Sequence, residues 1–98
     1  MKIQFSQSGG YAGLRMGCEI DTASLPPPEA ERLTALVENS GILQATSQRT
    51  PHAADLFTYE FAIEARQGNH QVSFDDMSLP ERVRPLLEYL QEQVHPLR

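Results

Sequence analysis

The chain has 98 residues, of which 40% are hydrophobic and 21% are charged, with a formal net charge of -5 and a pI near 5.0. This length predicts a single domain, residues 1–98, with one hydrophobic core. The acidic balance and the scattered positions of the eight lysines and arginines exclude nucleic acid as a partner, because phosphate binding needs clustered positive charge. A neutral or basic protein surface is the better match.

The sequence also bears on compartment and redox state. It has no run of about 18 apolar residues, so we expect no membrane partner. Polar residues follow Phe5 where a secretory signal would continue with apolar ones, and we therefore expect a cytoplasmic protein. Cys18 is the only cysteine, which excludes an intrachain disulfide, and its alternation with Met16 and Ile20 predicts a buried rather than a reactive thiol.

Two alternating segments open the chain and flank a glycine-rich stretch. Residues 1–7 place Ile3 and Phe5 on one face, and residues 14–21 alternate in the same way. Alternation of apolar and polar residues is typical of a half-buried strand. The sequence therefore predicts two antiparallel strands joined by a hairpin.

The stretch from Ser8 to Leu14, SGGYAGL, is the first candidate for partner contact. Gly9 and Gly10 suit the positive φ values of a two-residue hairpin turn, which explains them without any function. Tyr11 is not explained in this way, because a large aromatic side chain at an exposed tip loses its water contact only on meeting a partner.

A helix is predicted next, over residues 27–40. Three prolines before and within its first turn make a rigid entry, and the helix places Leu33 and Val37 on one apolar face. Gly41 supplies a stop signal. The polar segment that follows, residues 44–54, has no periodicity and is the longest predicted loop, which makes it a second candidate for partner contact.

The second half repeats the order of two strands and a helix. Phe57, Tyr59, Phe61 and Ile63 alternate along the strongest predicted strand, and a returning strand follows a turn at residues 65–69. This aromatic stripe predicts core packing rather than a ligand site, because burial against a helix accounts for all of it.

The last predicted helix begins near a capping-box pair, Ser78 and Glu81, and its apolar face extends to Val94. Pro85 should kink this helix or restart it at residue 85. The element order is thus strand, strand, helix, strand, strand, helix. It predicts an α+β fold with a four-stranded, mainly antiparallel sheet and two helices packed on one face.

No pattern of catalytic or metal-binding residues accompanies these elements. The three histidines, His52, His70 and His95, lack the spacings that metal sites use. The pair Asp75-Asp76 precedes the last helix and is interpreted as helix capping, favoured by the helix dipole. No nucleophile elbow or phosphate-binding loop occurs, so we expect no enzyme activity, no metal and no cofactor.

The chain resembles the emfourin family over almost its whole length. The stretch SGGYAGL at residues 8–14 and the later Arg84-Pro85-Leu86-Leu87 are together the most specific parts of the likeness. Further matching segments lie between and after them: Glu19-Ile20-Asp21, Leu25-Pro26, Arg32-Leu33, Leu36-Val37, Asp55, Phe57-Thr58-Tyr59, His70, Val72, Asp75-Asp76, Leu79-Pro80 and Tyr89-Leu90.

This resemblance implies a reversible, monomeric proteinaceous inhibitor of bacterial thermolysin-like zinc metallopeptidases such as protealysin, in which a glycine-supported loop blocks the substrate cleft. Such peptidases favour a bulky apolar residue after the scissile bond, and Tyr11 or Leu14 would fill that pocket. Leu25, beside the three prolines, is the rival anchor. The expected partner-binding residues are Ser8, Gly9, Gly10, Tyr11, Ala12, Leu14 and Leu25.

Relatives of this family are expected to vary in residues 44–54, which argues against a contact role for that loop.

A second function stays open besides inhibition. In that case the chain is a small non-catalytic interaction module that binds a non-protease protein through the same hairpin or through a sheet edge.

Overall fold

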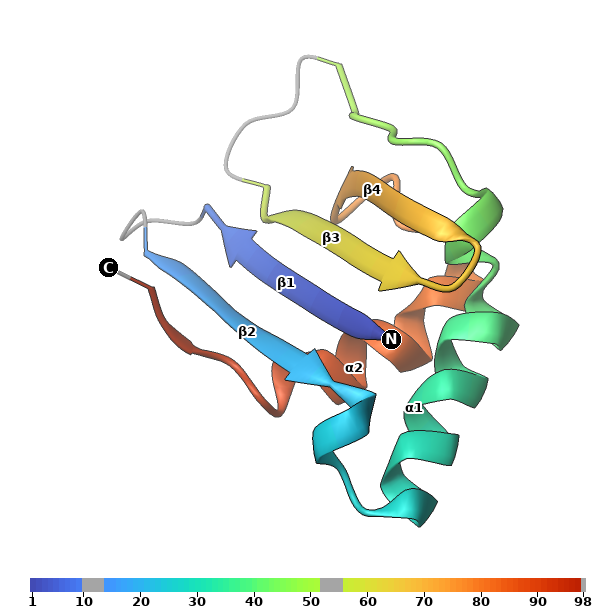
Figure 1. Cartoon of the computed structure of the whole chain (residues 1–98). Helices are drawn as coiled ribbons and strands as arrows, with labels where there is room; N and C mark the ends of the chain where they lie inside the picture. The colour runs from blue at the N-terminus through green and yellow to red at the C-terminus, as the bar shows by residue number, and fades with distance from the viewer. Residues whose placement is uncertain (10–13, 52–55, 98) are drawn as a thin grey trace.

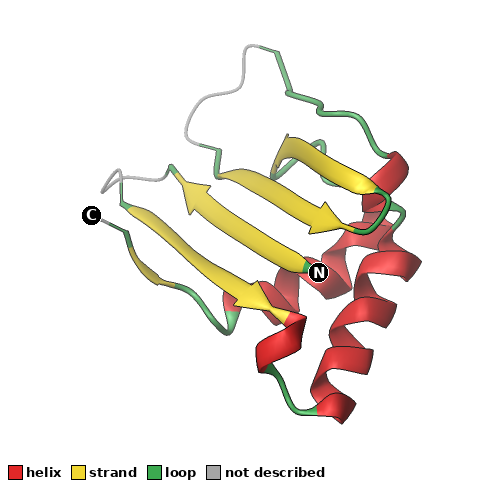
Figure 2. Cartoon of the chain, viewed as in Figure 1, coloured by secondary structure: helices red, strands yellow, loops and turns green. Residues whose placement is uncertain are grey.

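The computed structural model describes residues 1–9, 14–51 and 56–97. Within these residues the chain forms one antiparallel sheet with two α-helices on one of its faces (Figures 1 and 2). The strand order is β4-β3-β1-β2-β5, with β1 in the centre. The strands are β1 (Lys2–Ser8), β2 (Arg15–Asp21), β3 (Thr58–Ala65), β4 (Gly68–Asp75) and β5 (His95–Pro96).

The predicted α+β class and element order are confirmed, but the predicted number of strands is wrong by one. The additional strand, β5, has only two residues and pairs with Met16 and Gly17 of β2. The last helix was expected to continue to Val94, whereas it ends at Gln91 and the chain then turns back along the sheet edge. A strand this short carries no alternation, so only its pairing with β2 defines it.

The first helix, α1 (Pro27–Ser40), has the predicted bounds. Pro27 and Pro28 occupy its first turn, where backbone N–H groups have no partner within the helix and a missing donor therefore costs nothing. Gly41 ends the helix with a φ of 71°, a left-handed conformation that glycine adopts without steric strain. Local signals were therefore sufficient to place both ends.

The second helix is split in two, as Pro85 predicted. A 3-10 turn over Glu81–Val83 leads directly into α2 (Arg84–Gln91), in which Pro85 lies in the first turn. The capping-box prediction is wrong. The Ser78 hydroxyl accepts a hydrogen bond from the Asp75 N–H at 2.9 Å and donates one to the Gln48 carbonyl at 2.9 Å, so it does not cap the helix.

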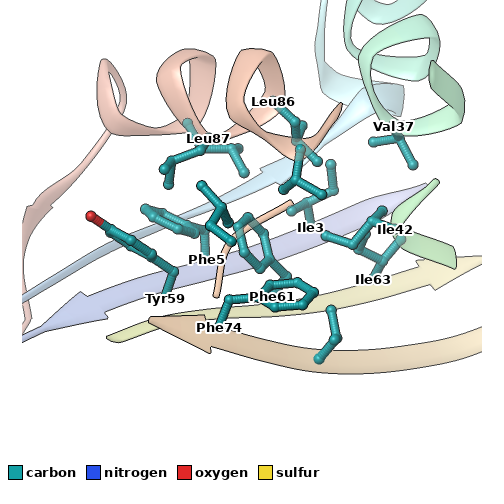
Figure 3. Close-up of a cluster of buried hydrophobic side chains, with 14 of the residues drawn as sticks. Ile3, Phe5, Val37, Ile42, Tyr59, Phe61, Ile63, Phe74, Leu86 and Leu87 are labelled. Carbon is teal, nitrogen blue, oxygen red and sulfur yellow. The ribbon is translucent and has the colours of Figure 1, made fainter. Parts of the chain in front are cut away.

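The core lies between the sheet and the two helices (Figure 3). Register places Phe5 of β1 opposite Phe61 of β3, with ring centroids 5.2 Å apart, and opposite Cys18 of β2. Alternation therefore directs one face of each strand to the helices, as predicted. The buried hydrophobic residues are Ile3, Phe5, Cys18, Leu33, Val37, Ile42, Tyr59, Phe61, Ile63, Val72, Phe74, Leu79, Val83, Leu86, Leu87 and Leu90.

Candidate partner-binding surface

The strands β1 and β2 lie within one residue of their predicted bounds, and the glycine-rich stretch connects them. Ser8 is the last residue of β1 and pairs with Arg15, the first residue of β2, so residues 9–14 make the connection. Gly10, Tyr11 and Ala12, three of the expected contact residues, lie outside the described residues. Ser8, Gly9 and Leu14 are described, and they lie at the two feet of the hairpin.

Gly9 is needed for the way in which the hairpin meets the start of β3. Its φ is 120°, a value that residues with side chains rarely adopt. A Cβ atom on this residue would lie 2.5 Å from the Leu56 carbonyl oxygen and 3.2 Å from Phe57 Cα. Backbone geometry and close approach therefore account for Gly9 without a direct role in binding.

Exposed apolar side chains gather at the same end of the sheet, which we call the hairpin end. Strand pairing places Ser8 beside both Arg15 and Thr58, and Thr58 beside Asp75, so the residues next to these positions are neighbours in space. Three of the large hydrophobic residues exposed in the described part of the chain lie in these flanking segments: Leu14 (62% exposed), Phe57 (39%) and Met77 (70%). A fourth, Leu97 (37% exposed), follows β5, and its N–H donates to the Arg15 carbonyl at 2.9 Å.

Asp75 organises the segment after β4. It is 4% exposed, and its carboxylate accepts hydrogen bonds from the Thr50 N–H (2.5 Å), the Thr50 hydroxyl (2.8 Å), the Met77 N–H (2.9 Å) and the Ser78 N–H (2.8 Å). The bonds from Thr50, joined by those from Ser78, lower the pKa of Asp75 to about 2, against the opposing effect of burial. The carboxylate is therefore charged and fully partnered at neutral pH.

Asp76 makes the matching contacts to the start of β3. Its carboxylate accepts hydrogen bonds from the Phe57 N–H at 3.0 Å and from the Tyr59 hydroxyl, and its own N–H donates to the Phe57 carbonyl at 3.2 Å. Burial, together with the hydrogen bond and charge of Asp76, raises the pKa of Tyr59, so this phenol stays protonated and remains a donor. We call Asp75 and Asp76 together the aspartate clasp.

The clasp replaces the helix-capping role that the sequence suggested for these two residues. Helix capping is a local contact, whereas Asp75 reaches Thr50 and Asp76 reaches Phe57. Phe57 and Met77 were not predicted as surface residues, because alternation placed Phe57 on the core face of its strand and Met77 lies in no predicted strand or helix face. The available signal was the single large apolar residue in an otherwise polar run, Asp75-Asp76-Met77-Ser78.

Leu25, the rival anchor, lies at the other end of the sheet. It follows β2 and the 3-10 turn Thr22–Ser24, whereas the hairpin precedes β2 (Figure 1). Its side chain is partly buried and packs against the core. The structure thus brings Ser8, Gly9 and Leu14 together and separates Leu25 from them.

The described residues hold no cluster of metal-binding side chains. No group of three or more His, Cys, Asp or Glu side chains lies close enough among them to hold a metal ion. Cys18 is buried, as predicted, with its Sγ 3.8 Å from the Leu90 carbonyl oxygen, and burial raises the pKa of its thiol. A hollow of about 420 Å³ on the open face of the sheet is lined by Arg15 and Glu60, with their charged groups 3.9 Å apart, and by Glu19, which is paired with Lys2 at 3.4 Å. The carboxylates of Glu19 and Glu60 are thus each paired with a basic side chain.

Comparison with known proteins decides the family. A family model described as Emfourin matches residues 5–91, which is most of the chain. The chain belongs to the emfourin family. Membership in this family implies a role as a metallopeptidase inhibitor rather than as an enzyme. No curated protein and no solved structure matches the chain. Within the described residues, none of the helices has the length and apolar character needed to cross a membrane.

Proposed function

We propose that this emfourin is a reversible inhibitor of a bacterial thermolysin-like zinc metallopeptidase of the protealysin type. The match of the family model to residues 5–91 is the observation that carries the proposal. The inhibitor acts as a monomer in the cytoplasm and occupies the substrate cleft of the peptidase with its hairpin end.

The geometry of the hairpin end supports this mode of binding. Both feet of the hairpin are paired in the sheet, Ser8 with Arg15 and Thr58, and Gly9 packs against the backbone of Leu56. A surface whose backbone is already fixed loses little conformational freedom on binding, and more of the contact free energy appears as affinity. Leu14 adds an exposed apolar side chain of the kind that a hydrophobic specificity pocket accepts.

An inhibition assay tests the proposal. Purified protein is titrated into protealysin and into thermolysin, with a peptide substrate, and we expect stoichiometric or competitive loss of activity. Full activity of both peptidases at micromolar inhibitor would contradict the proposal. A partner captured from the native bacterium that lacks the His-Glu-x-x-His zinc motif would then favour the interaction-module alternative.

A further inference from the structure

The aspartate clasp fixes two exposed apolar residues beside the hairpin. Phe57 is 39% exposed and its N–H donates to Asp76, while Met77 is 70% exposed and its N–H donates to Asp75. In both residues the backbone is thus fixed by a hydrogen bond to a carboxylate, while the side chain is exposed to solvent. Exposed apolar side chains that gather in one place mark a contact site more often than single, scattered ones do.

Asp76 of the clasp is linked to both Phe57 and Tyr59 at the start of β3. Asp76 and Phe57 bond reciprocally through their backbone and side-chain groups, and the Phe57 ring stacks on Tyr59 with centroids 6.5 Å apart. Tyr59 in turn donates its hydroxyl to Asp76. Asp76 therefore holds the backbone of Phe57, and Tyr59 packs against its ring, while 39% of the residue stays exposed.

We propose that Phe57 and Met77 form a second apolar contact with the same peptidase, and that Asp75 and Asp76 are positioning residues for that contact. This inference rests on the proposed function. We assign this contact to the same peptidase because the patch is continuous with the hairpin. A Cβ atom added to Gly9 would lie only 3.2 Å from Phe57 Cα. A peptidase that engages the hairpin reaches this patch with the surface next to its cleft.

Two serine substitutions test the contact. Met77→Ser removes a side chain that is mostly in solvent, so the melting temperature should stay unchanged while the inhibition constant rises about tenfold. Phe57→Ser should raise the inhibition constant by at least about the same factor, with a lower melting temperature from the lost stacking on Tyr59. Ile20→Ser, at the opposite end of the sheet, is the matched control and should lower the melting temperature but leave inhibition unchanged.

A double-mutant cycle tests the positioning role of the clasp. Asp76→Asn removes the charge and leaves only one side-chain acceptor for the two donors, Phe57 N–H and Tyr59 hydroxyl. We expect about a tenfold weaker inhibitor in the wild-type background and little further loss in the Phe57→Ser background. Equal losses in both backgrounds would show that Asp76 does not act through Phe57 and would overturn its positioning role.

The outcomes separate this inference from the proposed function. If the wild-type protein inhibits neither peptidase, the proposed function fails and the second contact fails with it. If the wild type inhibits, and Met77→Ser and Phe57→Ser have the same inhibition constant as the wild type, only the second contact is wrong. A weaker inhibitor in the Ile20→Ser control, or a wild-type dimer that Met77→Ser dissociates in sedimentation, would assign the apolar contact elsewhere and also contradict it.

Discussion

The two ends of the sheet differ in how far their apolar side chains are exposed to solvent. At the end opposite the hairpin, Ile20, Leu25 and Ala65 are partly buried and pack against the core. At the hairpin end, Leu14 and Met77 are exposed although the backbone around them is held by strand pairing and by the aspartate clasp. The fold therefore packs its apolar residues against the core at one end and leaves them exposed to solvent at the other.

The largest effect is expected from Gly9→Ala at the hairpin end. The alanine must adopt a φ of 120° and brings its Cβ to 2.5 Å from the Leu56 carbonyl oxygen, so either the hairpin or the start of β3 has to move. Strain and overpacking together should lower the free energy of unfolding by about 2–4 kcal/mol. Urea unfolding monitored by circular dichroism measures this loss.

Gly68→Ala is the control for that experiment at the opposite end of the sheet. Gly68 has a similar φ of 129°, but a Cβ there meets no atom within 4 Å. Only backbone strain remains, and we expect a loss of about 1–2 kcal/mol. Equal losses in the two variants would show that the contact between Gly9 and Leu56 does not matter for stability.

The contrast between the two ends shows which parts of the fold could be predicted from the sequence. The bounds of α1 were predicted because prolines and Gly41 act within a few residues of the helix ends. The strand faces followed from alternation. β5 could not be predicted, because it exists only through its pairing with Met16 and Gly17, far away in the chain.

The hairpin-end surface was predicted less completely for the same reason. Spacing identified the glycines and Leu14 and placed a strand on either side of them, but it did not predict the close approach of Gly9 to the backbone of Leu56. The clasp joins Asp75 to Thr50 and Asp76 to Phe57 across 25 and 19 positions of the chain, which no local pattern encodes. Side-chain hydrogen bonds over such separations appear only once the sheet has placed these segments together.

Tyr11→Ala tests the tip of the hairpin, and the expected effect is on binding rather than on folding. Loss of a buried aromatic anchor should weaken inhibition by about 1–3 kcal/mol with an unchanged melting curve. The inhibition constant and a thermal melt are measured on the same preparation. Unchanged inhibition by a folded variant would place the anchor elsewhere, and an unfolded variant would assign Tyr11 to the core.

Leu14→Ala tests the foot of the hairpin with a somewhat smaller expected effect. Because this side chain is 62% exposed, truncation should change the free energy of unfolding by less than about 0.5 kcal/mol. Inhibition should weaken by about 1–2 kcal/mol if the side chain enters an apolar pocket. A variant that inhibits as well as the wild type would remove Leu14 from the contact surface.

The smallest effect near neutral pH is expected from the ionisation of Asp75. Its pKa is lowered from an ordinary 3.8 to about 2 by the hydrogen bonds that its carboxylate accepts, so the folded protein holds this group charged more firmly than the unfolded chain does. Its contribution to stability is therefore complete above about pH 5 and is lost as the pH falls through 3.8 toward 2. Asp75→Asn removes this titration, and the difference in unfolding free energy between wild type and variant should be constant from pH 7 to about pH 5 and shrink at lower pH.

Denaturant unfolding of both proteins at several pH values measures that difference. A difference that stays constant down to pH 2 would show that the clasp carboxylate is not held charged by Thr50 and Ser78, and the hairpin end would then lack the fixed backbone that distinguishes it from the other end of the sheet.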